Sequence, residues 1–392
     1  MPSIIRANAQ FVWGKPKREP RNSRLRWTGF ITPKESGAFR FGFAGDTPFR
    51  ITVGKEKIVD AWDSFDPQKT GTISLQAGHT YALTVEARQN GDRGDQHLMW
   101  ERPAHNAQAA LTAARKADLT VFVGGLSPHL EGEEMTVHAP GFAGGDRTSL
   151  DLPAAQEKLL ERLGSLRKPV ILVLMNGSAI STNWADQHIP AIVEAWYPGG
   201  EGGHAVAALL AGDFSPAGRL PVTFYKSAEQ LPPFKSYAMT GRTYRYFTGT
   251  PLYPFGYGLS YTQFSYGPIT LDHDSVVTGG SVHAFVDVTN TGSRDGDEVV
   301  QLYVSHPIAG APIRALQGFK RIPLKAGETR KVDFVLDERA MSMVDASGKR
   351  AVSPGAVTLW IGGGQPTTRD GLPPAAGTSA SFTVTGQKKI SD

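Results

Sequence analysis

The chain has 392 residues, of which 40% are hydrophobic and 20% are charged, and this balance excludes an intrinsically disordered protein. Its 41 basic and 37 acidic residues leave a net charge of +4, too thinly spread for the basic face of a nucleic-acid-binding protein. The absence of cysteine excludes disulfides, cysteine-ligated zinc and thiol chemistry, and no apolar run approaches the ~18 residues of a membrane-spanning helix. The length predicts two or three domains.

Residues 1–104 are predicted to form an all-β domain. The N-terminus has no basic head followed by an apolar stretch, so it is not a signal peptide, and we expect the natural polypeptide to begin further upstream. Apolar and polar residues alternate in short segments separated by Gly, Pro and Asp, which is typical of a sandwich or barrel. These segments are 25–33, 37–45, 49–54, 71–75 and 79–88.

Residues 105–235 alternate between helical and strand patterns. Alanines at helical spacing predict a helix over 105–117, and the apolar run 117–125 predicts a strand buried on both faces. Two further strands are predicted at 168–177 and 191–199, and a glycine-bounded helix at 202–212. The helix at 153–163 is predicted to place one apolar stripe inward, made of Leu152, Ala155, Leu159, Leu160 and Leu163.

This order predicts an α/β sandwich with a mostly parallel sheet covered by helices. Ligands of such sheets bind beyond the carboxyl ends of the strands, so we expect the chemistry in the loops after Val123, Met175 and Trp196. The residues Met175–Ser178 approach a ligand there or form a plain turn. His129 and His138 have no second ligand at metal-like spacing and are interpreted as ordinary loop histidines.

Two groups of side chains in these loops are candidates for chemistry. Glu131, Glu133 and Glu134 follow the first strand, and crowding of like charges suits a general acid, although a solvated acidic loop would show the same pattern. Trp196 and Tyr197 precede a glycine-rich segment, where an aromatic pair either stacks on a sugar ring or packs in the core.

The remaining chain is predicted to hold a connector and a third domain. Residues 236–262 are rich in aromatic side chains and link the α/β region to the last region. Over 263–385 strand patterns return at a spacing that suits an immunoglobulin-like or fibronectin-like sandwich.

Several stretches together resemble glycoside hydrolase family 3, over nearly the whole chain beyond residue 100. They are LSPHLEGEEM, GGDRTSLDLP, the run AWYPGGEGGHAVAALLAGDFSPAGRLPVTFY and PLYPFGYGLSYTQF. Residues 27–62 resemble a PA14 domain, which some family members carry inserted in their second domain. Residues 263–385 resemble the family's C-terminal fibronectin type III-like domain.

The resemblance implies a retaining β-glycosidase that removes single sugars from β-linked oligosaccharides or glycosides, with no metal or cofactor. Such chemistry needs two carboxyl groups about 5–5.5 Å apart, one as nucleophile and one as acid/base. In the family the acid/base glutamate lies on a loop of the α/β sandwich, which corresponds here to Glu131 or Glu133, with Glu134 third. Family relatives with an acidic residue, one spacer and then a glutamate favour Glu133, whereas those with a Pro-x-x-Glu pattern, matched here from Pro128, favour Glu131, which is slightly preferred. β-Glucosides and β-xylosides both suit the family.

One departure from the family changes the expected activity. The family's aspartate nucleophile lies on an N-terminal (β/α)8 barrel of about 250 residues, and neither that length nor a Ser-Asp-Trp or Ser-Asp-Tyr motif occurs here. The chain is therefore expected to be the C-terminal part of such an enzyme, to lack also the first strand of the α/β domain, and to be inactive without a separate barrel.

The alternative is a non-catalytic carbohydrate-binding module. It would bind sugar through Asp46 and Trp62 of the PA14-like region, or through Trp196 and Tyr197. By family habit the protein is expected to be periplasmic or secreted if a signal lies upstream.

Overall fold

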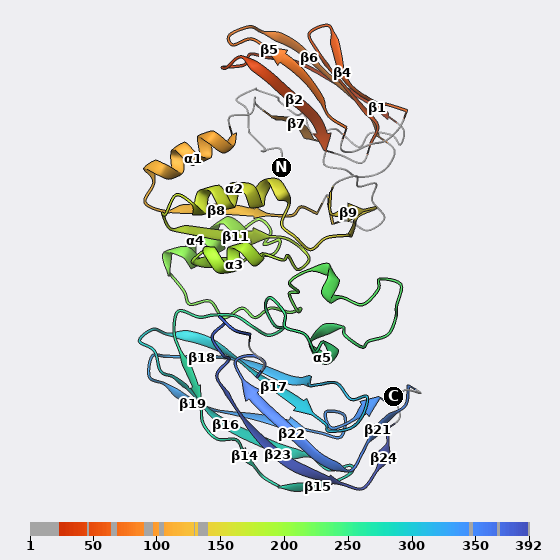
Figure 1. Cartoon of the computed structure of the whole chain (residues 1–392), viewed down its shortest axis with the longest axis vertical. Coiled ribbons are helices and arrows are strands. Elements are labelled where there is room, and N and C mark those ends of the chain that lie inside the picture. Colours follow the sequence, from red (N-terminus) through yellow and green to blue (C-terminus); the bar gives the residue numbers. More distant parts are fainter. Residues whose placement is uncertain are drawn as a thin grey trace. The chain divides into compact units, whose positions relative to one another are not determined.

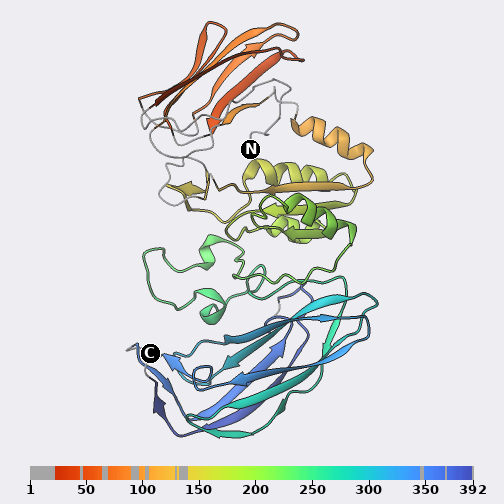
Figure 2. The same ribbon diagram turned by 180° about the vertical axis from the view of Figure 1, so that it is seen from behind.

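The computed structural model describes residues 23–44, 47–63, 69–89, 97–101, 106–128, 130–131, 140–344, 348–366 and 369–390. The chain divides into two compact units. The first comprises Met1–Thr148, Pro153–Val173 and His188–Ile192, and the second comprises Ser149–Leu152, Leu174–Gln187 and Val193–Asp392. Figures 1 and 2 show their elements from opposite sides.

The N-terminal strands of the first unit form two sheets around one core (Figure 1, red to orange). The strands are β1 (Ser23–Ile31), β2 (Gly37–Ala44), β3 (Phe49–Val53), β4 (Glu56–Ala61), β5 (Gly71–Leu75), β6 (Tyr81–Gln89) and β7 (His97–Glu101). Their orders are β1-β6-β3-β4 and β5-β2-β7. Alternate side chains such as Phe49, Ile51 and Val53 point inward, because successive residues of a strand face opposite sides of the sheet. The predicted all-β character is confirmed, while the likeness to PA14 stays a prediction.

One carboxylate of this β region gives the stability a predictable pH dependence. The carboxylate of Asp60 accepts hydrogen bonds from Lys57 Nζ at 2.6 Å and Arg50 Nε at 2.8 Å, and these contacts lower its pKa to about 2. In the unfolded chain the group titrates near its ordinary value, so its ionised form stabilises the fold above that value and ceases to do so as pH falls toward 2. We expect Asp60→Asn to lower the free energy of unfolding at pH 6 but not at pH 2, as measured by urea denaturation.

The matched control for this test is Asp63→Asn. It makes the same charge change, but Asp63 is 87% exposed and lies 4.0 Å from Arg88. The prediction would be contradicted if Asp60→Asn lowered the free energy of unfolding by the same amount at pH 6 and at pH 2.

The middle of the chain alternates helices and strands, as predicted. The elements are α1 (Asn106–Lys116), β8 (Thr120–Gly125), β9 (Phe142–Ala143), β10 (Asp146–Arg147), α2 (Ala154–Gly164), β11 (Val170–Met175), α3 (Asn183–His188), β12 (Ala191–Glu194) and α4 (Gly202–Ala211). The main sheet has the order β12-β11-β8, and β9 and β10 form a separate two-stranded sheet. Helix α4 ends at Gly212, whose φ of 80° is the left-handed conformation that glycine adopts without strain. The parallel direction of the main sheet stays a prediction.

Two predictions about burial in this region are wrong. Strand β8 is not buried on both faces, since Leu119, Val121 and Val123 are 47%, 44% and 57% exposed. Helix α2 contacts β8 through Gln156, next to Gly124, and the opposite face of the strand, which carries Val121 and Val123, is exposed. On α2, Leu160 and Leu163 are buried but Ala155 is exposed, because it lies in the first turn, away from the buried stripe.

The C-terminal region of the second unit is a β-sandwich, as predicted (Figure 2, teal to blue). One sheet has the order β13-β16-β14 with β19 beside β16, and the other has the order β15-β23-β22-β17-β18. In β16 the alternating Val282, Ala284, Val286 and Val288 fill the core. The strands are β13 (Phe264–Tyr266), β14 (Thr270–Leu271), β15 (Ser275–Val277), β16 (Val282–Asn290), β17 (Gly296–Ser305), β18 (Ala315–Leu324), β19 (Thr329–Leu336), β20 (Met343–Val344), β21 (Arg350–Val352), β22 (Gly355–Gly362), β23 (Gly377–Thr385) and β24 (Lys388–Lys389).

The connector that precedes this sandwich has little regular structure. It contains the four-residue α5 (Thr243–Tyr246), and a short 3-10 helix (Ala228–Gln230) lies just before the connector. No helix in the described part of the chain is long and apolar enough to span a bilayer.

Candidate active site

The loop after β8 places Glu131 in a nearly closed environment in the first unit. The backbone N–H of Glu131 donates to the carbonyl oxygen of Ser127 at 3.2 Å, which forms a tight turn. The Glu131 side chain is only 10% exposed and lies 4.0 Å from Arg147 Nη1. Arg147 is itself 12% exposed, and its guanidinium lies 5.4 Å from the ring centroid of Phe142. Glu131 is therefore part of a buried ion pair and is not a solvated loop carboxylate.

The rest of the acidic loop lies outside the described residues. This applies to Glu133 and Glu134, and also to the two loop histidines His129 and His138. Within the described residues, no group of three or more His, Asp or Glu side chains is placed to hold a metal ion.

The end of β11 carries a buried amide in the second unit. Asn176 is fully buried, and its Nδ2 donates to the carbonyl oxygen of Ser178 at 2.9 Å and to Glu194 Oε2 at 3.2 Å. Its Oδ1 has no hydrogen-bond partner within the described part of the chain. The Met175–Ser178 segment is thus a turn that the Asn176 side chain closes, and the same side chain connects it to the last residue of β12.

Trp196 follows β12 in a strained backbone conformation. Its φ is 54°, a left-handed value that non-glycine residues rarely adopt and that often occurs at functional sites. The Trp196 N–H donates to Glu194 Oε1 at 3.1 Å, and its ring meets the edge of Phe224 at 6.0 Å. Glu194 therefore accepts hydrogen bonds from both Asn176 and Trp196. Tyr197 is 36% exposed.

The sequence pointed to Trp196 and Tyr197 as candidates, but it did not point to Glu194, which hydrogen-bonds to both Asn176 and Trp196. A signal was present, because Glu194 is an acidic residue at the end of an apolar strand, two positions before the tryptophan.

The two remaining sequence candidates belong to the β region of the first unit. Asp46 lies outside the described residues. Trp62 is only 8% exposed, and the guanidinium carbons of Arg88 and Arg50 lie 4.5 and 4.6 Å from its ring centroid. The two arginines therefore make cation–π contacts with the Trp62 ring.

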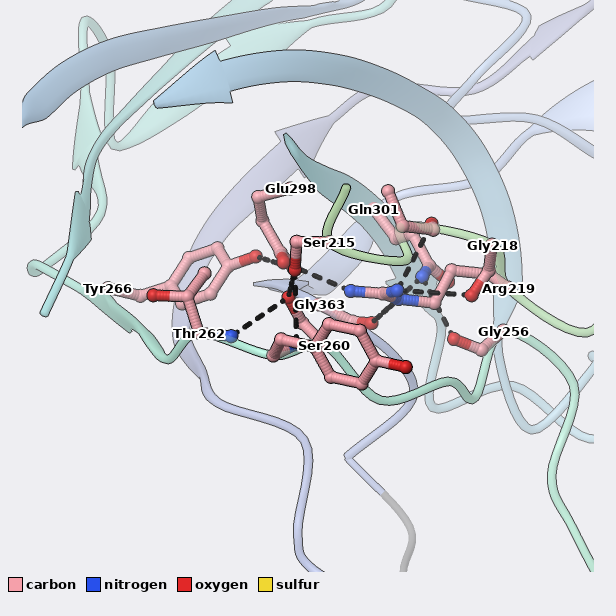
Figure 3. A network of polar contacts seen from close by, with 12 residues as sticks. Ser215, Gly218, Arg219, Gly256, Ser260, Thr262, Tyr266, Glu298, Gln301 and Gly363 are labelled. Carbon is pink, nitrogen blue, oxygen red and sulfur yellow. Dashed lines mark hydrogen bonds and ion pairs between the residues drawn. The ribbon is translucent and has the colours of Figure 1, made fainter. Parts of the chain in front are cut away.

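A buried polar network in the second unit connects the segment before the connector with the C-terminal sandwich (Figure 3). Arg219 Nη2 pairs with Glu298 Oε2 at 3.0 Å, and the two side chains are 9% and 2% exposed. The Tyr266 hydroxyl donates to Glu298 Oε1 at 2.8 Å, and Arg219 Nε donates to the carbonyl oxygen of Gly363 at 2.9 Å. A Cβ at Gly363 would lie 2.3 Å from Glu298 Oε1, so the close approach requires glycine. Burial raises the pKa of Glu298, and the network is structural.

Comparison with known proteins explains this combination of elements. Residues 40–261 match the glycosyl hydrolase family 3 C-terminal domain, and residues 298–365 match a fibronectin type III-like domain. The chain belongs to glycosyl hydrolase family 3. The family 3 match begins at residue 40, inside the N-terminal β region.

Individual relatives in the family are named for two sugars. The chain is 42% identical over 337 residues to a xylan 1,4-beta-xylosidase of Xylanibacter ruminicola, covering 85% of this chain and 39% of that protein. It is 39% identical over 267 residues to a periplasmic beta-glucosidase of Salmonella typhimurium, covering 64% of this chain and 35% of that protein.

The solved structure of a beta-glucosidase from Kluyveromyces marxianus in complex with glucose aligns with a TM-score of 0.77. The sequence identity is 26%, and the alignment covers 93% of this chain and 45% of that one. The chain spans about two-fifths of the length of the curated relatives it matches.

Proposed function

We propose that this chain is the C-terminal portion of a retaining family 3 β-glycosidase that acts on β-glucosides or β-xylosides. The observation that carries the proposal is the 42% identity to a xylan 1,4-beta-xylosidase over 85% of this chain. In the proposal, the loop after β8 supplies the acid/base, Glu131 or Glu133, while the nucleophile belongs to a (β/α)8 barrel. Among the described residues, the α/β region has one main sheet of three strands, β12-β11-β8, and no (β/α)8 barrel is present.

The open face of β8 supports a requirement for another protein part. Leu119, Val121 and Val123 are about half exposed and alternate with partly buried residues on an edge strand. Exposed apolar side chains on a sheet edge favour packing against a further element. We propose that this face packs against the part of the enzyme that carries the barrel.

A complementation assay tests the proposal. The purified chain alone is expected to hydrolyse neither aryl β-glucoside nor aryl β-xyloside, because an acid/base alone cannot form the covalent glycosyl intermediate. Addition of the part of the Xylanibacter ruminicola relative that this chain does not match, which we propose to carry the barrel, is expected to give turnover. Val121→Lys, which places a charge on the β8 face, is expected to abolish that turnover, whereas Val335→Lys, at a similarly exposed valine of β19, is expected to preserve it.

Two outcomes would contradict the proposal. Turnover by the chain alone would show that the nucleophile lies within these 392 residues. If no hydrolysis occurs after the barrel-bearing part is added, and the chain nevertheless binds sugar, the result would favour the carbohydrate-binding module.

A further inference from the structure

A cavity of about 410 Å³ lies in the second unit, at residues from α5, β17 and β18 and at residues 339, 342–344 and 350. This volume is within the range of small-molecule sites. None of its described lining residues is acidic, and three are arginines: Arg245, Arg339 and Arg350. A hollow lined by one sign of charge concentrates ligands of the opposite sign.

Two of the three arginines have no carboxylate partner among the described residues, and the guanidinium carbon of Arg245 lies 5.8 Å from the ring centroid of Tyr246. Among the described residues, no carboxylate lies within 4.0 Å of Arg245 or Arg339. Arg350 Nη1 donates to Ser342 Oγ at 3.0 Å, and Ser342 Oγ in turn donates to the carbonyl oxygen of Arg339 at 2.7 Å. Burial lowers the pKa of His306, another lining residue, so the positive charge near neutral pH comes from the arginines.

Aromatic side chains give this cavity a fixed wall. The ring of Tyr244 stacks on Phe255 with centroids 4.2 Å apart, and its hydroxyl accepts a hydrogen bond from the backbone N–H of Leu316 at 3.1 Å. The carbonyl oxygen of Arg245 accepts a hydrogen bond from the N–H of Ile313 at 2.7 Å, which ties α5 to the segment before β18. A wall that is already ordered lowers the entropy cost of binding.

We propose that this cavity binds the carboxylate of a uronic acid carried by an oligosaccharide. Guanidinium groups pair with carboxylates through parallel charge-assisted hydrogen bonds, and tyrosine rings supply an apolar surface for a sugar ring. The choice of a saccharide over a free anion rests on the proposed function, whereas the preference for negative charge rests on the cavity alone. The site would hold an acidic sugar unit of the oligosaccharide.

Isothermal titration calorimetry of the whole chain tests this site. The probes are xylotriose carrying one glucuronic acid, neutral xylotetraose of the same length, and inorganic phosphate. The acidic sugar is expected to bind at least tenfold more tightly than either of the others. Arg245→Gln and Arg339→Gln are each expected to weaken that binding about tenfold. Arg321→Gln, which removes an arginine of β18 that does not line the cavity, is expected to leave it unchanged.

Equal affinity for the acidic and neutral sugars would overturn the proposal, as would phosphate binding as tightly as the uronate. Absence of binding by the acidic sugar would overturn it as well. These readouts do not use hydrolysis, so failure of the site and failure of the proposed glycosidase function are distinguishable. The complementation assay with neutral aryl glycosides reports on the function, and the calorimetry reports on the cavity.

Discussion

Replacement of Arg219 by methionine is expected to lower the free energy of unfolding of the C-terminal sandwich by about 3–5 kcal/mol. The substitution leaves the Glu298 carboxylate, 2% exposed, without the guanidinium that it faces at 3.0 Å. The hydroxyl of Tyr266 remains as a donor to that carboxylate, but one neutral hydrogen bond does not replace a cation. The cost is therefore the uncompensated charge and exceeds the net contribution of the pair.

Hydrogen exchange in increasing urea measures this cost separately for each part of the chain. Amides of β17, the strand that carries Glu298, are expected to lose protection in the Arg219→Met variant, while amides of β3 in the first unit serve as the internal reference. The double variant Arg219→Met/Glu298→Met is expected to regain much of the loss, since it removes both charges. Arg321→Met breaks an exposed pair with Asp297 and is expected to cost less than about 1 kcal/mol. A cost for Arg219→Met no greater than that of Arg321→Met would refute the prediction.

This network was beyond the reach of sequence reasoning for a physical reason. Arg219 and Glu298 are 79 positions apart, and neither occupies a position that periodicity marks as buried. The sandwich strands that contact them were predictable, because alternation such as that of Val282 to Val288 directly reflects a strand with one face in a core. Burial of a charge depends on its partner, and the partner is known only from tertiary structure.

The errors around β8 have a similar origin. An apolar run such as TVFVGG indicates a strand, which the structure has, but the sequence does not say what covers each face. Val121 and Val123 are exposed here, on the face of β8 opposite to the one that α2 contacts through Gln156 and Gly124. The candidate site was likewise predictable only in part. The sequence marked Trp196 as a candidate by its residue type and its position after a strand. Its left-handed backbone and its hydrogen bond to Glu194 arise from three-dimensional structure.

The acid/base assignment leads to the second large expected effect. In the assembly of this chain with a barrel-bearing part, substitution of the true acid/base by glutamine is expected to reduce hydrolysis of alkyl β-glycosides by 10²–10⁴-fold, the usual contribution of general acid–base catalysis. Formation of the glycosyl intermediate from dinitrophenyl glycosides is expected to change far less. That leaving group departs without a proton, so the first chemical step does not need the acid.

Substitution of Glu131, unlike that of a solvent-exposed glutamate, is expected to change stability as well as catalysis. Glu131 is paired with Arg147 and 90% buried in its side chain, whereas Glu133 lies outside the described residues. Glu131→Gln is therefore expected to lower the free energy of unfolding of the first unit even if Glu133 is the acid/base. Arg147→Met breaks the same ion pair without touching a candidate carboxyl, so it serves as the matched control for stability.

Leaving-group dependence then separates catalysis from stability. If Glu131 is the acid/base, Glu131→Gln retains the pre-steady-state burst of dinitrophenol and loses alkyl glycoside hydrolysis, while Glu133→Gln and Glu134→Gln resemble the unchanged assembly. Turnover after the burst also slows, because hydrolysis of the glycosyl intermediate needs the same group as general base. If Glu133 is the acid/base, the selective loss moves to Glu133→Gln, and Glu131→Gln resembles Arg147→Met in both stability and rate. Equal losses in the rate of the first chemical step on both substrates, for all three glutamate variants, would exclude the loop after β8 as the source of the acid/base. A loss in that step that does not depend on the leaving group does not come from proton donation.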